Sequence, residues 1–429
     1  MGNPGFRLEP VLAGSKRGTC RNDRQVFKKF QSLDLTDKET IGVLLLNLGG
    51  PDSIQSVRPF LNNLFSDREI IKLGPSFLQR PIACFISSLR SQKTKKMYSL
   101  IGGKSPILDI TNAQAQALED MLNWSVGVLC EKSKRANNIT NTITPILHHS
   151  NTPKFKVYVG MRYWHPFIKD TVQEILRDGI KHLVVLSLYP HYSKAATGSA
   201  IAEFKRAISR YPPPTHPSPS RGEGEGDLAV KYIEQWYDFP PYIEALAELI
   251  YKGISEFDGN PSISPFFKGR LEKSPSLIKG GEGRFKDIDV LYSAHSLPED
   301  FIKKGDPYVD HLKATITAVN SSLVTRHSSL FKWHLSFQSR SGPVKWLQPS
   351  TDEMIKKLAS EGCKNLLVVP ISFVSDHIET LYEIDILYKK LAEKHGINLK
   401  RCESLNTSEK FIEALSDIVI KNAKNLGWI

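Results

Sequence analysis

A histidine stands at the end of an apolar run in the second half of the chain. The run IDVLYS is typical of a buried strand, and His295 lies in the turn that follows it. Imidazole exchanges protons near neutral pH, so a histidine at a strand terminus is a candidate catalytic base. A core histidine bonded to the backbone would give the same pattern. Both interpretations stay open from this segment alone.

A second reactive segment is SDHIETLYEID, which follows the apolar run LLVVPISF. If a helix begins at Asp376, Glu379 and Glu383 lie four residues apart on one of its faces. Like charges at that spacing repel each other, so the pattern favours acids that relay protons or guide a cation. Solvated surface acids are the alternative interpretation. His377, next to Asp376, would orient the start of the helix or hydrogen-bond to the site from behind.

Apolar runs typical of buried strands alternate with amphipathic segments typical of helices. In the first half the order is IGVLLLNL, SPILDITNAQAQALEDML, FKVYVGM, PFIKDTVQEILRDG and HLVVLSLY. The second half repeats the first: VLLLNLGGPD parallels VLYSAHSLPE, and EILRDGIKHLVVLSLYPHY parallels KLASEGCKNLLVVPISFVS. The sequence therefore predicts an α/β protein of two similar Rossmann-like lobes, each a parallel sheet flanked by helices.

Composition gives the expected boundaries of these lobes. The chain of 429 residues exceeds the usual size of a single core, which favours two domains. Stretches rich in Pro, Gly, Ser or Asn are interpreted as inserted loops. The expected segments are an N-terminal extension at 1–40, a first lobe at 41–211 with an insertion at 125–153, a low-complexity insertion at 212–226, and a second lobe at 227–429 with an insertion at 258–286.

The strand ends are the expected position of a ligand. In open α/β sheets, ligands bind beyond the carboxyl ends of the strands. Two facing lobes would place Leu48, Arg162 and the segment Tyr189–Tyr192 of the first lobe opposite the strand ends of the second, which carry His295, Gln338 and the segment Phe373–Glu379. A cleft between the lobes is therefore the predicted active site.

Several other functions lack their sequence signals. No GxSxG elbow, GxGxxG fingerprint or P-loop occurs, which argues against serine hydrolysis and nucleotide chemistry. The net charge of +12 would suit nucleic acid, but no nucleic-acid motif accompanies it. The five cysteines lie far apart without a CxxC pair, so neither a disulfide framework nor a zinc or iron–sulfur site is indicated.

Residues 70–108 carry seven Lys or Arg and no acid. Apolar residues recur there at helical spacing beside basic ones, as in an interfacial helix. Two interpretations stay open: a solvated basic helix face, and a membrane-facing lip that contacts an anionic membrane surface. No apolar run approaches the about 18 residues of a membrane span, and the amino terminus lacks a signal-peptide core. We expect a cytoplasmic protein, with peripheral attachment to the inner face of the cytoplasmic membrane if the second interpretation holds.

These motifs closely resemble the ferrochelatase family. The resemblance runs from about Ile41 to Leu405 and is carried by LLLNLGGPDS, IGGKSPI, VGMRYWHP, YPHYSKAATGS, YSAHSLP, GPVKWLQPSTDE and FVSDHIETLYEID. The pair SAHSLP and SDHIETLYE, in this order, is specific to that family. The resemblance implies the chelatase architecture, with a porphyrin cleft between two Rossmann-like lobes.

The family's activity implies a function for the chain and roles for its acids. Ferrochelatases are lyases that insert Fe2+ into protoporphyrin IX to form protohaem with release of two protons, the terminal step of haem biosynthesis. His295 resembles the family's catalytic histidine, which takes pyrrole protons or binds the metal, and Glu379 resembles its partner across the macrocycle. Glu383 and Asp385 would continue the acidic helix as a proton or metal conduit. Iron is a substrate here and not a permanent cofactor.

The resemblance also assigns residues around the reacting pair. Substrate-binding positions would be Leu48, Arg162, Tyr163, Tyr189, Ser293 and Trp346. Supporting positions behind the catalytic pair would be Asp376, His377 and Asp385.

Three departures from the family pattern refine these expectations. The chain ends at Ile429 and has Lys194 where animal-type members place a cluster cysteine, so no 2Fe–2S cluster is expected. Members that act on coproporphyrin have a tyrosine in the place of Leu48, so protoporphyrin IX is the expected substrate. Ser99 and Leu100 stand where some members have arginines, which leaves the propionate contacts open.

Two alternatives remain, one a related enzyme and the other a protein of a different class. A chelatase that places cobalt or nickel into a tetrapyrrole would share the fold, but we do not expect it to carry both motifs. A non-catalytic porphyrin or haem carrier would keep the cleft and lose turnover. The presence of both His295 and Glu379 favours the enzyme.

Overall fold

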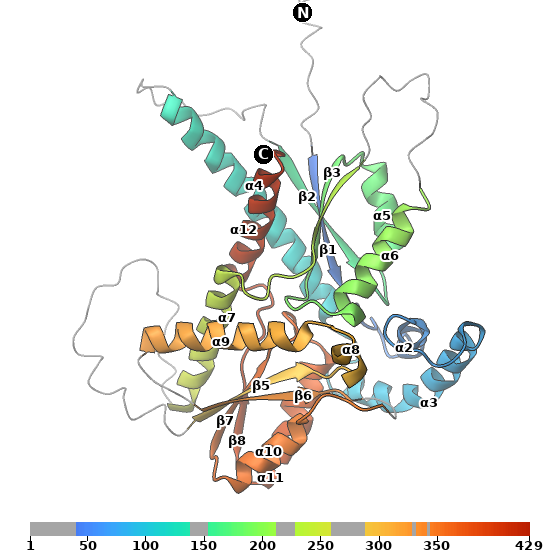
Figure 1. Cartoon of the computed structure of the whole chain (residues 1–429), viewed down its shortest axis with the longest axis vertical. Coiled ribbons are helices and arrows are strands. Elements are labelled where there is room, and N and C mark those ends of the chain that lie inside the picture. The colour runs from blue at the N-terminus through green and yellow to red at the C-terminus, as the bar shows by residue number, and fades with distance from the viewer. Residues whose placement is uncertain (1–39, 138–152, 212–227, 259–287, 328–331, 341–343) are drawn as a thin grey trace, which may run out of the picture. The chain divides into compact units, whose positions relative to one another are not determined.

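The chain is described by a computed structural model (Figure 1). The described residues are 40–137, 153–211, 228–258, 288–327, 332–340 and 344–429. The expected insertion at 212–226 lies outside them, as do the expected N-terminal extension up to residue 39 and the insertion at 258–286 from residue 259 on.

The first sheet has four parallel strands in the order β2-β1-β3-β4. They are β1 (Thr40–Asn47), β2 (Lys154–Met161), β3 (His182–Ser187) and β4 (Ala229–Ile233). The second sheet repeats this arrangement in the order β6-β5-β7-β8, again all parallel. Its strands are β5 (Ile288–His295), β6 (Lys332–Gln338), β7 (Asn365–Pro370) and β8 (Asn398–Arg401). Two similar parallel sheets flanked by helices confirm the predicted fold class.

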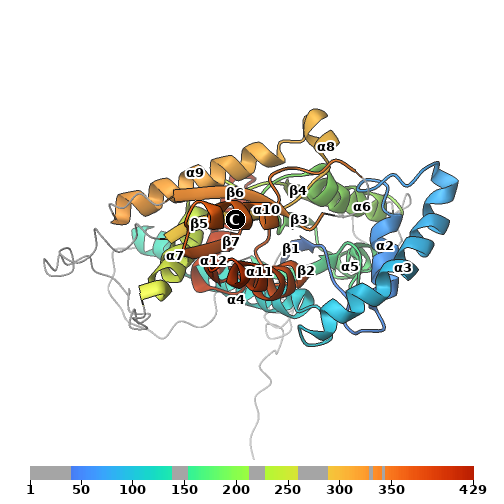
Figure 2. The same ribbon diagram turned by 90° about the horizontal axis from the view of Figure 1, so that it is seen from below.

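Helices connect the strands and cover both faces of each sheet (Figures 1 and 2). The helices of the first half are α2 (Val57–Ser66), η1 (Ser76–Leu78), α3 (Gln79–Ser99), α4 (Ile107–Asn137), α5 (Ile168–Arg177), η2 (Lys194–Gly198) and α6 (Ser199–Ile208). Those of the second half are α7 (Pro240–Ser255), η3 (Glu256–Asp258), α8 (Glu299–Lys303), α9 (Tyr308–His327), α10 (Thr351–Ser360), η5 (Glu379–Tyr388), α11 (Lys389–Lys394) and α12 (Glu409–Asn425).

The central strands are apolar on both faces because both faces are covered. On β1, Val43 and Leu45 face a core shared with α4, while Leu44 and Leu46 face α5 and α6. A strand covered on one side only would alternate apolar and polar residues, whereas the run VLLL is continuous. The same division holds in β5, where Leu291 packs with α10 and α11 on one face.

A layer of helices joins the two sheets. Leu118 of α4, Leu246 of α7, Leu312 of α9 and Leu415 of α12 belong to one hydrophobic cluster that also contains side chains of β1 and β5. Figure 1 shows α4 and α12 side by side on the flank of the first sheet. The two lobes therefore bury a common core.

Two expected boundaries differ from the structure. Residues from 227 on were assigned to the second lobe, but β4 pairs with β3 and completes the first sheet. The low-complexity segment before β4 thus interrupts a parallel β3–α6–β4 unit and does not separate the lobes. Residues 125–137 of the insertion expected at 125–153 belong to α4, which continues to Asn137, and residues 138–152 lie outside the described part of the chain.

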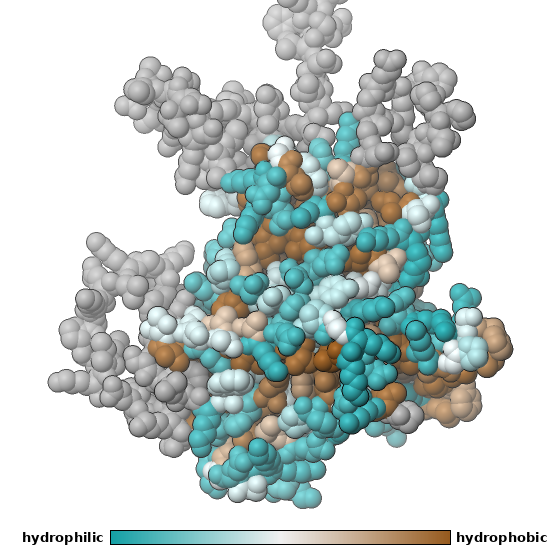
Figure 3. All heavy atoms as spheres, viewed as in Figure 1, coloured by the Kyte–Doolittle hydropathy of each residue, from teal (hydrophilic) through white to brown (hydrophobic). Residues whose placement is uncertain are grey.

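The basic segment forms η1 and α3, which project beside α2 (Figure 2). Several apolar side chains on it are exposed: Phe77 by 75%, Phe85 by 65% and Leu89 by 66%. Figure 3 shows hydrophobic side chains at the outer edge of the molecule, where α3 lies. Within the described residues, no helix is long and apolar enough to cross a membrane.

Candidate active site

His295 is the last residue of β5, and its backbone is held from two sides. The His295 N–H donates to Ser372 Oγ at 2.8 Å, and its carbonyl accepts a hydrogen bond from the Tyr308 hydroxyl at 3.0 Å. Tyr308 and Ser372 are themselves hydrogen-bonded at 2.7 Å. These contacts fix the position from which the imidazole extends.

The imidazole of His295 is paired with Glu379. His295 Nδ1 lies 3.0 Å from Glu379 Oε2, and the side chain of His295 is 34% exposed while that of Glu379 is 12% exposed. Within the described residues the other ring nitrogen, Nε2, makes no hydrogen bond. One edge of the ring is therefore oriented by a carboxylate and the opposite edge is available to a substrate.

The acidic helix differs from the α-helix predicted to start at Asp376. It is a π-helix, η5, that begins at Glu379, and Asp376 and His377 precede it. π-Helical turns are rare and frequent at functional sites. Glu379 and Glu383 still face the same neighbour, the turn after β6: Gln338 Nε2 donates to the Glu379 carbonyl at 3.1 Å, and Ser339 Oγ donates to Glu383 Oε2 at 2.5 Å.

The ionisable groups of the site have pKa values that are shifted in different directions. Burial alone would raise the pKa of Glu379, but the charge and hydrogen bond of His295 bring it below its ordinary value. Burial alone would lower the pKa of His295, but the charge and hydrogen bond of Glu379 raise it above its ordinary value, so each partner favours the charged form of the other. Burial, followed by the charge of Glu379, raises the pKa of Glu383 to about 7. One strongly acidic carboxyl group and one that exchanges protons near neutral pH thus lie on the same helix.

His377 lies behind the catalytic pair. It is buried, its Nδ1 lies 3.1 Å from the Ser375 carbonyl oxygen, and its Nε2 lies 3.9 Å from Glu379 Oε1. Burial lowers the pKa of His377, which keeps the ring neutral. Its predicted position as a support of the site agrees with this geometry.

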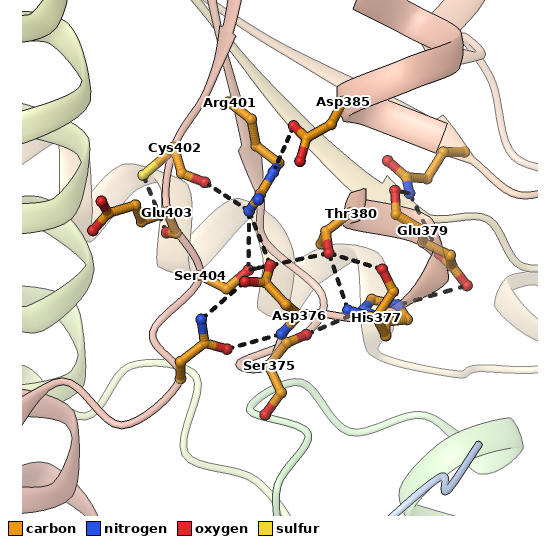
Figure 4. Close-up of polar contacts among 12 residues, drawn as sticks. Ser375, Asp376, His377, Glu379, Thr380, Asp385, Arg401, Cys402, Glu403 and Ser404 are labelled. Carbon is orange, nitrogen blue, oxygen red and sulfur yellow. Dashed lines mark hydrogen bonds and ion pairs between the residues drawn. The ribbon is translucent and has the colours of Figure 1, made fainter. Parts of the chain in front are cut away.

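Arg401, at the end of β8, hydrogen-bonds to Asp376, which precedes the acidic helix, and to Asp385 within that helix (Figure 4). Its guanidinium donates to Asp376 Oδ1 and to Asp385 Oδ1, both at 2.9 Å. Asp376 also accepts hydrogen bonds from Thr380 at 3.0 Å and Ser404 at 2.7 Å. Asp385, predicted as part of a conduit or as a support, is thus bonded to Arg401, so the geometry favours a support.

We expect Arg401→Gln to destabilise the fold. Burial would raise the pKa of Asp376, but the charge of Arg401 lowers it, so removing the guanidinium leaves a half-buried carboxylate unpaired. The free energy of unfolding at pH 7 should fall by about 2 kcal/mol, measured by urea denaturation. Because the pKa of Asp376 is lower in the folded than in the unfolded state, its ionised form stabilises the fold at pH values above the unfolded pKa. This stabilisation is lost as the pH falls through the folded pKa. The difference in free energy of unfolding between variant and wild type should therefore narrow at low pH.

The matched control for this prediction is Lys252→Gln. Lys252 pairs with Glu403, which is close to Arg401 in sequence, but both side chains are 57% exposed. Such a surface pair contributes less than about 1 kcal/mol. Equal losses in the two variants would mean that Arg401 acts as an ordinary surface charge.

The first lobe brings aromatic and apolar side chains to this site. Tyr189 meets Phe373 edge to face at 6.2 Å between ring centroids, and Phe373 meets His295 in the same way at 5.9 Å. Leu48 packs in a hydrophobic cluster with Tyr163 and with Ile378 of the second lobe. The structure therefore places Leu48 and Tyr189 near the His295–Glu379 pair.

Arg162, Tyr163 and Ser293, predicted to bind the substrate, are hydrogen-bonded to other side chains. Arg162 Nη2 and the Tyr163 hydroxyl both bond Asp67 Oδ2, at 2.8 and 2.7 Å. Ser293 is buried and donates to Gln338 Oε1 at 2.6 Å. The polar groups of these three residues therefore have hydrogen-bond partners within the protein, and their role in substrate binding stays a prediction. Trp346 is half-buried, in a bridge with Pro298, and its buried indole Nε1 has no hydrogen-bond partner among the residues that the structure describes.

Sequence reasoning missed four supporting residues. Ser372 and Tyr308 hold the backbone of His295, Ser339 bonds Glu383, and Arg401 clamps the acidic helix. Ser339 has a φ of +66°, which is uncommon for a residue with a side chain and is often associated with functional positions. Ser339 and Ser372 follow strands β6 and β7, so the rule that ligands bind beyond strand ends could have found them.

The fold and the site together define a class of protein. Two Rossmann-like parallel sheets, with a histidine at one strand end paired to an acidic π-helix, are the arrangement expected of a metal chelatase. The model of the ferrochelatase family matches residues 40–423. The chain therefore belongs to the ferrochelatase family.

Curated relatives agree with this assignment. A ferrochelatase of Geotalea uraniireducens (strain Rf4) is 44% identical over 388 residues, covering 90% of this chain and 99% of that protein. A ferrochelatase of Geotalea daltonii is 43% identical over 390 residues, covering 91% and 99%. Among solved structures, the sirohydrochlorin chelatase SirB from Bacillus subtilis subspecies spizizenii is similar at 13% identity, with a TM-score of 0.42 and coverage of 90% and 96%.

Proposed function

We propose that the chain inserts Fe2+ into protoporphyrin IX to form protohaem, with His295 and Glu379 at the reacting centre. The observation that carries the proposal is the His295–Glu379 pair, whose atoms lie 3.0 Å apart while the other edge of the ring is unpaired. Membership of the ferrochelatase family supports the reaction type. Fe2+ is a substrate in this proposal, and we propose no permanent cofactor and no 2Fe–2S cluster.

The chemistry requires proton acceptors and negative charge in one place. Metal insertion removes two pyrrole protons from the macrocycle while a dication approaches. The ionised Glu379 supplies negative charge beside the imidazole, and an approaching dication would displace any proton on His295 to solvent by electrostatic repulsion. The neutral ring could then accept the two pyrrole protons one after the other, each passing on before the next is taken. Glu383, whose pKa is about 7, could take the proton onward at neutral pH.

Haem formation is the direct test of this proposal. Purified protein is incubated without oxygen with protoporphyrin IX and Fe2+, while free-porphyrin fluorescence and the haem absorption spectrum are followed. Repeated turnover would support the enzyme. Porphyrin binding without metal insertion would favour a carrier, and turnover with Co2+ or Ni2+ but not Fe2+ would favour a chelatase of another metal.

The apolar surface near the pair would hold the flat macrocycle. Leu48 is half-buried and packs against the same hydrophobic cluster as Ile54, Leu64 and Ile378. Burying apolar area stabilises the complex by about 25 cal/mol per Å2, and a tight fit can hold the ring in a bent conformation that exposes its nitrogen lone pairs.

Leu48→Arg should weaken porphyrin binding itself. A guanidinium placed in this apolar surface loses hydration without gaining a partner, so we expect the Kd for protoporphyrin to rise about tenfold or more. Fluorescence titration measures the affinity. Leu48→Met, which conserves volume and polarity, is the control and should bind nearly as wild type does. An unchanged Kd in Leu48→Arg would remove Leu48 from the binding surface.

We also propose that α3 contacts an anionic membrane surface. Phe77, Phe85 and Leu89 are exposed, and Lys93 and Lys96 extend from the same helix. Exposed apolar side chains beside basic ones match an interfacial helix, in which apolar groups enter the lipid boundary and cations meet its headgroups. The cytoplasmic membrane is the surface that this proposal implies.

Charge reversal of Lys93, Lys95 and Lys96 to glutamate should release the protein from vesicles. Each basic residue near an anionic surface contributes about 1 kcal/mol, so removing three charges should weaken binding about 100-fold. Co-sedimentation with vesicles that contain phosphatidylglycerol measures this effect. The control is reversal of Lys389, Lys390 and Lys394, three exposed lysines of α11. Binding that is insensitive to salt and to the α3 reversal would contradict the proposal.

A further inference from the structure

Asp306 connects the two lobes through its carboxylate. It lies in the short connection between α8 and α9 of the second lobe (Figure 1). Its Oδ1 accepts the backbone N–H of Tyr308, the first residue of α9, at 3.1 Å. Its Oδ2 accepts the Ser193 hydroxyl at 3.2 Å and the backbone N–H of Lys194 at 2.8 Å, both from the first lobe. The two oxygens of the carboxylate therefore have their donors in different lobes.

The contact with the first lobe is made at the start of a helix. Ser193 is buried and precedes η2, whose first residue is Lys194, and η2 continues directly into α6. The first N–H groups of a helix have no partner within it, and a negative charge is favourable beside them. Ser193 Oγ accepts the N–H of Ala195 at 3.2 Å, and Asp306 accepts the N–H of Lys194. The carboxylate thus completes the hydrogen bonding of this helix start from the opposite lobe.

The contact with the second lobe leads to His295. Tyr308 is buried, and its hydroxyl donates to the His295 carbonyl at 3.0 Å. Asp306 holds the backbone of Tyr308, and the side chain of Tyr308 holds the backbone of His295. The His191 ring of the first lobe also meets the Tyr308 ring edge to face, at 6.3 Å between centroids. A continuous series of hydrogen bonds therefore runs from the start of η2 to the strand end that carries the imidazole.

We propose that Asp306 is a positioning residue, which sets the place of His295 relative to the first lobe by fixing Tyr308. This inference rests on the proposed function, in which the macrocycle lies against the apolar surface around Leu48 while His295 acts on its nitrogens. Leu48 belongs to the first lobe and His295 to the second. The imidazole meets the pyrrole protons only if the lobes keep a fixed separation, and a displacement of about 1 Å can cost about 100-fold in rate.

This role requires a carboxylate, because both oxygens act as acceptors. Asparagine has nearly the same size but only one acceptor oxygen. In Asp306→Asn the NH2 group would meet either the N–H of Tyr308 or the donors of Ser193 and Lys194. The substitution therefore breaks the series of hydrogen bonds on one side with little change in shape.

Initial rates of haem formation and fluorescence titration with protoporphyrin IX, both with the full chain, test the proposal. We expect Asp306→Asn to lower kcat about tenfold or more, and the porphyrin Kd to change less than about threefold because the surface around Leu48 is untouched. The matched control is Asp310→Asn. Asp310 is an exposed acid in the first turn of α9, so this variant loses the same charge near the same helix start. Its kcat and Kd should both match wild type.

Two further measurements separate positioning from a general structural role. If Asp306 acts through Tyr308, the double variant Asp306→Asn/Tyr308→Phe should be no less active than the weaker of the two single variants. The backbone amide of His295 donates to Ser372, which is itself bonded to Tyr308. In protein labelled with 15N-histidine and free of substrate, the NMR resonance of that amide should therefore move in both single variants and stay in place in Asp310→Asn.

The NMR measurement does not require metal insertion, so it tests Asp306 even if wild type makes no haem, a result that would overturn the proposed function instead. Three results would overturn the role of Asp306: a wild-type kcat in Asp306→Asn, losses that multiply in the double variant, or a His295 resonance that does not move. If Asp306→Asn does not fold, Tyr308→Phe tests the same series of hydrogen bonds. A wild-type kcat and an unmoved resonance in Tyr308→Phe would then overturn the proposal.

Discussion

Replacing His295 with alanine should abolish haem formation while protoporphyrin still binds. The imidazole is the group whose unpaired edge could meet the pyrrole protons, and loss of a positioned general base costs about 100- to 10,000-fold in rate. The apolar surface formed around Leu48 is untouched by this substitution. Initial rates of haem formation give kcat, and fluorescence titration gives the porphyrin Kd. We expect kcat to fall at least about 1,000-fold and the Kd to change less than about threefold.

A second histidine of the same lobe provides a matched control. His334 Nε2 lies 2.9 Å from Asp289 Oδ1, so it forms a histidine–carboxylate pair like that of His295. Asp289 is near the start of β5, whereas His295 is at its end. His334→Ala should therefore leave kcat near the wild-type value. Parallel losses of porphyrin binding and kcat in His295→Ala would show that the histidine holds the substrate and does not act on it.

Glu379→Gln should also remove most of the activity, for an electrostatic reason. Glutamine keeps the size of the side chain and can still bond His295, but it removes the charge that would attract a dication. We expect kcat to fall about 100-fold or more. Because Glu379 raises the pKa of His295, the variant should also titrate its imidazole at lower pH, which NMR of the ring protons measures directly. At a pH above the pKa of His295 in this variant the imidazole would be neutral, but the variant would still be inactive because it lacks the charge of Glu379.

The control for this substitution is Glu393→Gln. Glu393 is exposed on α11, the helix that continues from η5, so it loses the same charge at a distance from His295. Activity and the imidazole titration should both match wild type. An unchanged pKa of His295 in Glu379→Gln would mean that the pair is not an ion pair in solution.

Much of the fold follows from local patterns. The continuous apolar runs identified β1, β3, β5 and β7, because strands covered on both faces have no polar side to interrupt them. The internal repeat was also sufficient to predict that the two lobes would be alike, and the two sheets have the same strand order. The short edge strand β4 was assigned to the wrong lobe, since its partner β3 lies beyond a low-complexity segment.

The site could be predicted only in part, because side-chain direction depends on tertiary contacts. His295 and Glu379 were found from their positions after apolar runs, and they do lie together. Arg162 also lies near a strand end, but its guanidinium is hydrogen-bonded to Asp67, which is 95 residues away in the sequence. The role of Arg401 could not be predicted from its neighbours in the sequence, because it depends on hydrogen bonds to Asp376 and Asp385, which lie outside its strand. The π-helix likewise has no distinct sequence period that separates it from an α-helix.

The helical layer shared by the two sheets limits how the halves can behave on their own. Side chains of α4 and α12 pack in the same core, and Gln114 of α4 donates to Ser375 Oγ at 3.0 Å and to the Asn406 carbonyl at 2.7 Å. A fragment cut between the sheets would expose that apolar layer to water and leave the buried amide without acceptors. Although the sequence repeats itself, each repeat is an incomplete folding unit. The duplicated halves have become mutually dependent, and neither should be separable as a stable domain.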